Sequence, residues 1–159
     1  MGFPAKAYVI TYEEKTTCLY TEAAVIKGNK QYTVKAVWDT GATRTAISCE
    51  LAELMGLSPD GSREFQAASG VVSSDVYEVD ILLPNDVLLK NVAVTGLELA
   101  TRSYDLLLGL DVITRGDFAI SSHGGKVTLS FRIPSRRKID FVEEELNDYN
   151  VIDTTDIDS

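Results

Sequence analysis

Apolar and polar positions in this chain form short alternating runs, typical of β-strands rather than of long helices. Residues 19–26 and 31–38 are two apolar-rich runs separated by Lys-Gly-Asn-Lys, a sequence that favours a β-hairpin. Further strands are predicted over residues 63–68, 74–83, 87–95, 104–108, 117–121 and 126–133. The pattern therefore predicts an all-β body.

One segment departs from this strand pattern. Ile47, Leu51 and Leu54 recur at the spacing of one helix face, so we expect a short amphipathic helix with Thr45 as a candidate cap. Gly56 would end it. The apolar stripe of this helix is interpreted as a packing surface.

Asp39 directly follows the apolar run 31–38 and is followed by Thr40, Gly41 and Ala42. An aspartate on a tight turn at the end of a buried strand is well placed for chemistry. Hydrolysis by water without a covalent intermediate needs one carboxylate as base and one carboxylic acid to polarise the carbonyl. Two carboxyl groups held about 3 Å apart retain one proton between them. We expect the Thr40 hydroxyl to lock the turn and Gly41 to let a backbone N–H reach the carboxylate.

The segment 37–43, Val-Trp-Asp-Thr-Gly-Ala-Thr, is followed by 107–113, Leu-Leu-Gly-Leu-Asp-Val-Ile. These motifs resemble the retropepsin-like aspartic proteases, and the order of parts is similar over about residues 18–134. The resemblance implies a retropepsin-like fold, with a closed β-barrel-like body, a flap hairpin and short helices. It also divides the chain into an N-terminal extension (1–17), a protease domain (18–134) and an acidic tail (135–159).

The resemblance also implies roles for single residues. Asp39 would be the catalytic residue, on an active-site turn formed with Thr40, Gly41 and Ala42. Leu108, Gly109 and Asp111 would support that turn from beneath, with Asp111 capping a short helix over 111–115 rather than serving as the second acid. Ser69, Gly70, Val71 and Val72 would form a flap turn against the substrate. The alternative for this turn is an ordinary hairpin.

A single Asp-Thr-Gly motif has a consequence for assembly. The two-lobed relatives carry two such motifs in one chain, so the second aspartate must come from a second copy. We therefore expect a homodimer with two-fold symmetry. Arg44 and Leu110 depart from the viral pattern, which has an acidic residue and an arginine there, and Arg44 is expected to meet Asp111.

The leading functional prediction is a homodimeric aspartic endopeptidase that acts on peptides or proteins and needs no cofactor or metal. The alternative is a non-proteolytic dimer of the same fold that binds a peptide or protein segment, which the changes at Arg44 and Leu110 favour slightly. An aspartyl-phosphate enzyme is disfavoured because no long helices separate the strands.

Composition limits the other classes of function. The 159 residues are 45% hydrophobic and carry a net charge of −9, which fits one globular domain and disfavours nucleic-acid binding. No run approaches the roughly 20 apolar residues of a membrane span, and no secretory signal is recognised, so a cytoplasmic protein is expected.

Few residues suit metal or thiol chemistry. Cys18, Cys49 and the single His123 lie far apart, so two buried free thiols and a surface histidine are expected, with no metal site. The basic run of Arg136, Arg137 and Lys138 is interpreted as a solvated linker. The alternative is that it forms a docking patch.

The acidic tail has too few apolar residues for a core of its own. It is expected to be flexible. The alternative is a segment anchored to the body or to a partner subunit by Phe141, Val142 and Leu146.

Overall fold

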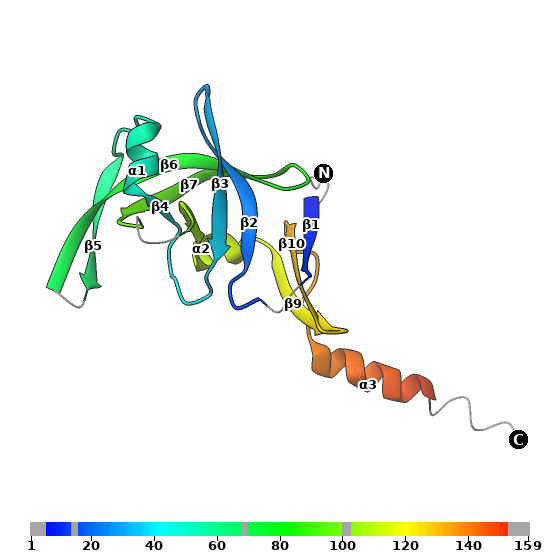
Figure 1. The fold of residues 1–159 in the computed structure, drawn as a ribbon. Coiled ribbons are helices and arrows are strands. Elements are labelled where there is room, and N and C mark those ends of the chain that lie inside the picture. Colours follow the sequence, from blue (N-terminus) through cyan, green and yellow to red (C-terminus); the bar gives the residue numbers. More distant parts are fainter. Residues whose placement is uncertain (1–5, 14–15, 68–69, 100–102, 153–159) are drawn as a thin grey trace, which may run out of the picture.

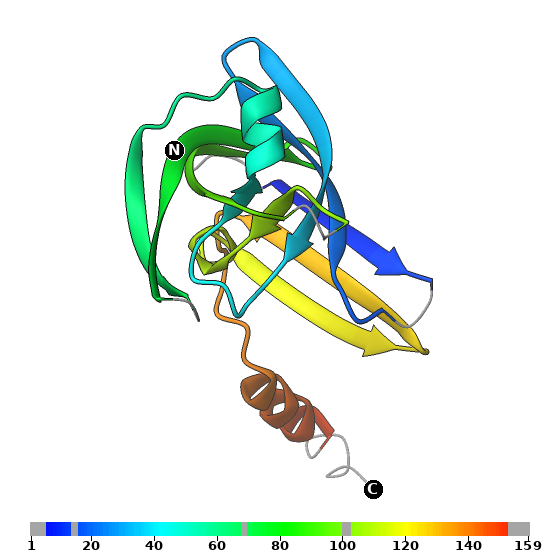
Figure 2. The ribbon, with the colours of Figure 1, turned by 60° about the vertical axis from the view of Figure 1, so that its left-hand side comes forward.

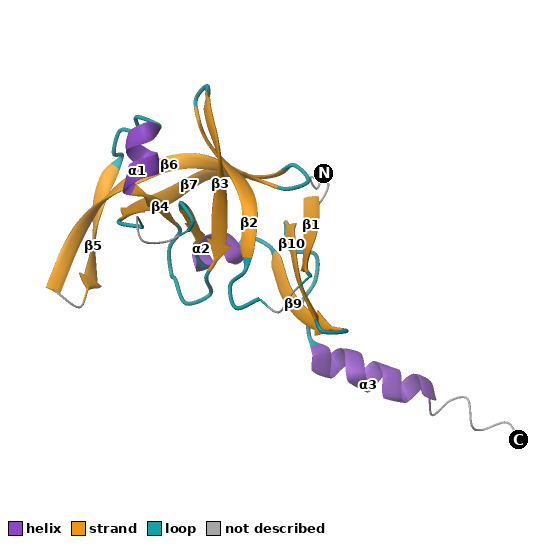
Figure 3. Cartoon of the chain, in the orientation of Figure 1, coloured by secondary structure: helices purple, strands orange, loops and turns teal. Residues whose placement is uncertain are grey.

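The computed structural model describes residues 6–13, 16–67, 70–99 and 103–152. Most of them lie in strands, as Figure 3 shows, so the all-β prediction is confirmed. The elements in chain order are β1 (Lys6–Tyr12), β2 (Tyr20–Lys27), β3 (Lys30–Trp38), β4 (Ala46–Ser48), α1 (Cys49–Leu54), β5 (Gly61–Ala67), β6 (Gly70–Leu83), β7 (Val87–Leu97), β8 (Leu106–Leu108), α2 (Leu110–Ile113), β9 (Asp117–His123), β10 (Lys126–Ile133) and α3 (Phe141–Ile152).

Six strands close into a barrel. Their order is β2-β3-β8-β4-β7-β6, and the ring closes because β6 also pairs with β2 through Ala24↔Leu82 and its neighbours. The pairs β3–β8 and β4–β7 are parallel, and the other pairs are antiparallel. β6 continues beyond the barrel and pairs there with β5, so these two strands project as a hairpin (Figure 1). Closure leaves few unpaired strand edges in the barrel wall.

A second sheet of three antiparallel strands, ordered β1-β10-β9, packs against the barrel (Figure 2). Phe118 of β9 and Phe131 of β10 contact the indole of Trp38 at the end of β3, with ring centroids 5.2 and 5.0 Å apart from it. Tyr8 of β1 is buried in the same core. The predicted N-terminal extension thus contributes, through β1, a strand and a core residue to the body.

The main core fills the barrel and the space between barrel and sheet. Val25 of β2, Ile81 of β6, and Leu106 and Leu108 of β8 are fully buried in it. Gly116 lies between α2 and β9, where an added Cβ would stand 1.9 Å from the Arg132 carbonyl oxygen. Only glycine therefore lets β9 approach β10 there, which fixes the second sheet directly after α2.

Two details of the predicted helices were wrong. The first helix is shorter than expected, and Ser48 rather than Thr45 caps α1, because the Leu51 N–H donates to Ser48 Oγ at 3.1 Å. Ser48 has the side-chain oxygen and extended backbone that an N-cap requires.

No helix in the described ranges is long and apolar enough to cross a membrane.

The acidic tail contains a helix that the sequence did not predict. α3 projects away from the barrel in Figures 1 and 2. Phe141, Val142 and Leu146 remain 67%, 71% and 59% exposed, so they do not anchor the tail to the body of their own chain. Glu143 and Glu144 lie in the first turn of α3, where negative charge is favourable to the helix dipole.

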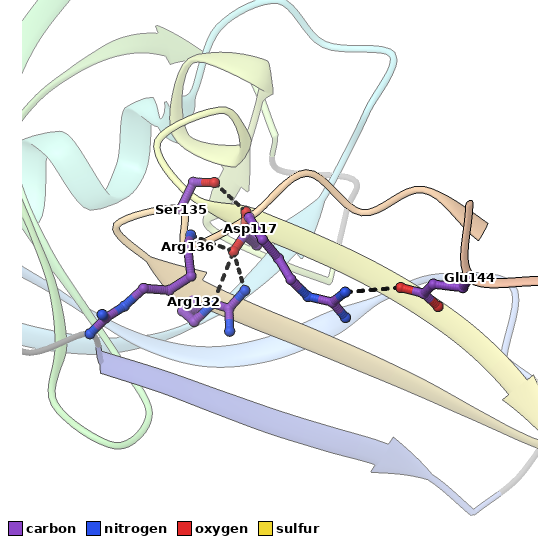
Figure 4. Close-up of polar contacts among 6 residues, drawn as sticks. Asp117, Arg132, Ser135, Arg136 and Glu144 are labelled. Carbon is purple, nitrogen blue, oxygen red and sulfur yellow. Dashed lines mark hydrogen bonds and ion pairs between the residues drawn. The ribbon is translucent and has the colours of Figure 1, made fainter. Parts of the chain in front are cut away.

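The linker between β10 and α3 is held by one carboxylate (Figure 4). Asp117, the first residue of β9, accepts hydrogen bonds from Arg132 Nε at 2.9 Å, Ser135 Oγ at 2.5 Å and the Arg136 N–H at 2.9 Å, and a second one from the Arg132 guanidinium. The bonds from Ser135 and Arg136, more than the charge of Arg132, lower the pKa of Asp117 to about 2. Arg137 continues the linker with an ion pair to Glu144 of α3.

Asp117→Asn should lower the free energy of unfolding at pH 7 by about 1–3 kcal/mol, since charge-assisted hydrogen bonds are lost. Because the folded-state pKa of Asp117 is depressed, its contribution exists above the unfolded pKa near 4 and disappears as the pH falls to about 2. Urea unfolding of both proteins between pH 7 and pH 2 measures this. A stability difference that stays constant over this range would contradict the assignment.

Candidate active site

Asp39 lies at the open end of the barrel, in the first position after β3. Its N–H donates to the Leu108 carbonyl at 3.0 Å, and its own carbonyl accepts from the Ala42 N–H at 3.2 Å. The Gly41 N–H donates to Asp39 Oδ1 at 2.8 Å. These three bonds fix the turn and one carboxylate oxygen, while the side chain stays partly exposed.

The expected lock by Thr40 is not present within the described residues. The Thr40 side chain is exposed and makes no hydrogen bond there, so the Gly41 N–H is the group that holds the carboxylate. A Cβ at Gly41 would lie 3.1 Å from Asp39 Oδ1, closer than most such contacts. The expectation that glycine admits a backbone N–H to the carboxylate therefore agrees with the geometry.

Gly109 lies directly beneath the Asp39 turn. The Leu110 N–H donates to the Ala42 carbonyl at 2.8 Å, which joins the start of α2 to the turn. A Cβ on Gly109 would stand 2.6 Å from the Arg44 carbonyl carbon and 2.9 Å from the Ala42 oxygen. Both neighbours are backbone atoms, so the loop can approach β8 this closely only above a glycine.

A buried hydroxyl connects the two halves of this arrangement. Thr45 Oγ1 accepts from the Gly109 N–H at 3.1 Å and donates to Asp111 Oδ1 at 2.7 Å. The Thr45 N–H also donates to Asp111 Oδ1, at 2.9 Å. Asp111 thus ties the chain after the Asp39 turn to α2.

These bonds correct two sequence predictions. Asp111 does not cap α2, since the N-cap is Gly109 and no side chain caps that helix. Asp111 does not pair with Arg44 either: its carboxylate is bound to Thr45, and Arg44 is exposed without an ion pair in the described part of the chain. The short Thr45 side chain bonds Asp111 without leaving the core, whereas Arg44 points to solvent.

An apolar wall lies on the Asp39 side of the barrel strands, because alternate strand residues share a face. Val37 is two residues before Asp39 and pairs with Leu107, which pairs with Ala46. Leu99 and Tyr104 cover these three side chains in a small separate cluster. The sequence analysis missed this wall, although counting back in twos from Asp39 and from Gly109 would have found Val37 and Leu107.

The predicted flap turn is largely strand. Gly70, Val71 and Val72 belong to β6, with Val71 opposite Gln66 and Val72 opposite Phe65. Ser69 lies outside the described residues. Val71 is 67% exposed, whereas Val72 faces a groove of about 620 Å³ between the hairpin and the barrel.

This groove is lined by both apolar and acidic residues. Apolar lining residues include Phe65, Tyr77, Leu97 and Leu99, and the acidic ones are Asp75 and Glu98. Burial, followed by the charge of Glu98, raises the pKa of the Cys49 thiol in the same groove. The thiol therefore stays protonated near neutral pH and is a poor nucleophile.

The two cysteines are half-buried and unpaired, so they are free as expected but more exposed than predicted. His123 lies at the exposed tip between β9 and β10, as the sequence indicated. Neither cysteine nor the histidine takes part in the hydrogen bonds around Asp39.

This chain is similar to known proteins in both sequence and fold. A family model described as "gag-polyprotein putative aspartyl protease" matches residues 24–115, more than half of the chain. The crystal structure of a retropepsin-like aspartic protease from Rickettsia conorii is similar with a TM-score of 0.58 at 19% identity, over 83% of this chain and 97% of that one. This similarity and the closed barrel show a retropepsin-like fold, which confirms the predicted fold class.

Weaker similarities extend to other solved structures. The retroviral protease-like domain of Ddi1 from Leishmania major gives a TM-score of 0.46 at 22% identity, over 66% of this chain and 82% of that one. Simian foamy virus (mac) protease gives 0.44 at 25% identity, over 60% of this chain and 91% of that one. No curated protein sequence matches this chain significantly.

Gly109→Ala should lower the melting temperature by several degrees, because the added methyl group meets backbone atoms that cannot rotate away. Gly61→Ala is the matched control, since a Cβ there has no neighbour within 4 Å and the φ angle is not positive. Thermal unfolding followed by circular dichroism measures both. Equal melting temperatures for the two variants would contradict the close-packing argument.

Thr45→Val removes the hydroxyl but keeps the shape of the side chain. The Gly109 N–H and Asp111 Oδ1 each lose a partner, so the free energy of unfolding should fall by about 1–3 kcal/mol. Thr33→Val, at an exposed position of β3, should change it by less than about 0.5 kcal/mol. Urea titration of the three proteins compares them, and a loss shared equally by both variants would refute a specific role for the Thr45 hydroxyl.

Proposed function

Because this chain belongs to the gag-polyprotein aspartyl protease family, whose model matches residues 24–115, we propose that it is a homodimeric aspartic endopeptidase. Each subunit contributes one Asp39 to a catalytic pair. The observation that carries the proposal is the Asp39 carboxylate, which is held at a strand end by the Gly41 N–H and is partly exposed. Such a group is oriented for chemistry, and among the described residues it forms no ion pair.

The second carboxylate is proposed to come from a second copy because Asp111, the acidic residue bonded to the chain just after the turn, is engaged. Asp111 Oδ1 accepts hydrogen bonds from the Thr45 hydroxyl and the Thr45 N–H. The sequence contains a single Asp-Thr-Gly motif. A two-fold axis beside the turn supplies the missing acid as a symmetry mate of Asp39.

The mechanism follows from the shared proton of the pair. The ionised carboxylate takes a proton from water as the oxygen attacks the scissile carbonyl carbon, and the protonated one donates to the carbonyl oxygen. The resulting diol intermediate collapses as its C–N bond breaks: one carboxyl group donates its proton to the departing nitrogen, and the other, ionised carboxylate takes a proton from a diol hydroxyl. The proposed reaction needs no metal or cofactor.

The substrate is proposed to be an extended peptide between the turn and the β5–β6 hairpin. Ser69, Gly70, Val71 and Val72 are assigned to the flap side of this cleft, since β6 carries the last three beyond the barrel. Closing such a hairpin over the peptide excludes water from the reaction. Thr40 is exposed beside Asp39, so its side chain is proposed to contact the second subunit.

Asp39→Asn should abolish cleavage, because an amide can neither take the proton from water nor share one. Wild-type protein and variant are incubated with a diverse peptide library from acidic to neutral pH, and products are identified by mass spectrometry. We expect a loss of at least about 100-fold in the variant.

Asp86→Asn is the matched control for this experiment. Asp86 lies in the exposed turn between β6 and β7 and has a left-handed φ of 57°, which asparagine tolerates. This variant should cleave like the wild type. A folded, dimeric wild type without any Asp39-dependent cleavage would favour the peptide-binding dimer instead.

A further inference from the structure

The outer half of β6 has one unpaired backbone edge. Among the described residues, β6 pairs with β7 only as far as Val76, and residues 70–75 pair with β5 alone. The Val76 carbonyl accepts from the Asp60 N–H at 2.8 Å, so the backbone groups of Val76 face the β5 side. Backbone groups alternate in direction along a strand, so those of Val71 and Ser73 point away from β5. They are free to bond to another strand.

This edge borders the groove of about 620 Å³ between the hairpin and the barrel. Residues 72–75 of β6 line one side of the groove, and residues 96–99 line the other. Leu99 also belongs to the cluster that covers Val37 on the Asp39 side of the barrel wall. The groove is therefore continuous with that wall and extends the proposed cleft.

The charged side chains that line the groove are acidic. Asp75 and Glu98 lie on its two sides, both are exposed, and neither forms an ion pair in the described part of the chain. Burial, and then the charges of Glu98, Glu50, Glu53 and Asp75, raise the pKa of the Cys49 thiol in the same groove. A cation is thus the complementary charge for an occupant.

The remaining lining suits the stem of a long side chain. Phe65, Tyr77, Leu97 and Leu99 provide apolar and aromatic surface beside the two carboxylates. Lysine and arginine bury an aliphatic stem while their charged end stays near polar groups, and a cation is also attracted to an aromatic ring. The groove therefore fits a basic side chain better than a purely apolar one.

We propose that an extended substrate segment with a lysine or arginine binds in this groove as a strand added to β6. The inference rests on the proposed function, because this segment is the part of the substrate remote from the scissile bond. Its backbone bonds to Val71 and Ser73, and its cationic side chain lies between Asp75 and Glu98. In strand addition, backbone bonds supply affinity and the side-chain pocket supplies specificity.

Binding is measured on the Asp39→Asn protein, which should not cleave what it binds. A diverse peptide library is passed over the immobilised protein, and retained peptides are identified by mass spectrometry. We expect them to be enriched in lysine and arginine. One retained peptide is then remade with glutamine at its basic positions, and fluorescence polarisation should show at least about tenfold weaker binding.

Substitutions in the groove test the charge. In the Asp39→Asn background, Glu98→Gln should reduce the difference between the two peptides at least about threefold, and adding Asp75→Asn should abolish it. Asparagine at position 75 can still accept the hydrogen bond of Tyr77. Glu78→Gln is the matched control, because Glu78 is an exposed residue of β6 outside the groove, and it should leave the difference unchanged. Circular dichroism checks that each variant folds.

Methylated peptides test the added strand. Successive N–H groups of a strand point to opposite edges, so a single N-methyl group should weaken binding at alternate residues of the segment. An equal effect at every position, or no effect at any, would exclude pairing with β6.

The outcomes separate this subsite from the catalytic proposal. Binding of basic peptides that depends on Glu98 and alternates with methylation supports the subsite, and if the wild type cleaves none of them, the endopeptidase proposal fails alone. Asp39-dependent cleavage without a preference for lysine or arginine keeps the endopeptidase and overturns the subsite. A preference that persists without Asp75 and Glu98, or a protein that binds no peptide, also overturns it.

Discussion

The contact between the Gly109 backbone and the loop above it is the constraint on which the candidate site depends. Gly109 lies so close to the backbone of Ala42 and Arg44 that no side chain fits between them. The Thr45 hydroxyl accepts a hydrogen bond from the Gly109 N–H and donates one to Asp111. An aspartate after an unsupported strand would move with its loop. Here its backbone is bonded to β8, so the carboxylate position is set by the barrel itself.

The same contact explains why the elements follow one another in this order. β8 lies between β3 and β4 in the barrel. α2 begins immediately afterwards, because Gly109 has an extended backbone and is the N-cap residue of that helix. Only three residues connect α2 to β9, and Gly116 in this connection allows the chain to approach the Arg132 backbone of β10 closely. The Asp39 turn, its supporting strand β8 and the second sheet form one continuous packed unit around Trp38.

Much of this was predictable because it depends on local patterns. The alternation of apolar residues identified most strands, and the Asp-Thr-Gly and Leu-Leu-Gly motifs identified the turn and its support. Predictions that required a side chain's direction were less successful. Arg44 was expected to meet Asp111, but Asp111 is bonded by Thr45, because the threonine side chain is buried whereas the arginine is exposed. The tail helix was missed since it lacks the packed apolar face on which the prediction relies.

The anchoring of the linker by Asp117 has a consequence for the growing polypeptide. The carboxylate that opens β9 takes its partners from Arg132, Ser135 and Arg136, all of which leave the ribosome later than the whole barrel. The barrel and the Asp39 turn can therefore form first, while β9 acquires its final bonds only when the linker has emerged. Synthesis from the N-terminus thus completes the bonds of β9 only after every residue of the Asp39 turn has emerged.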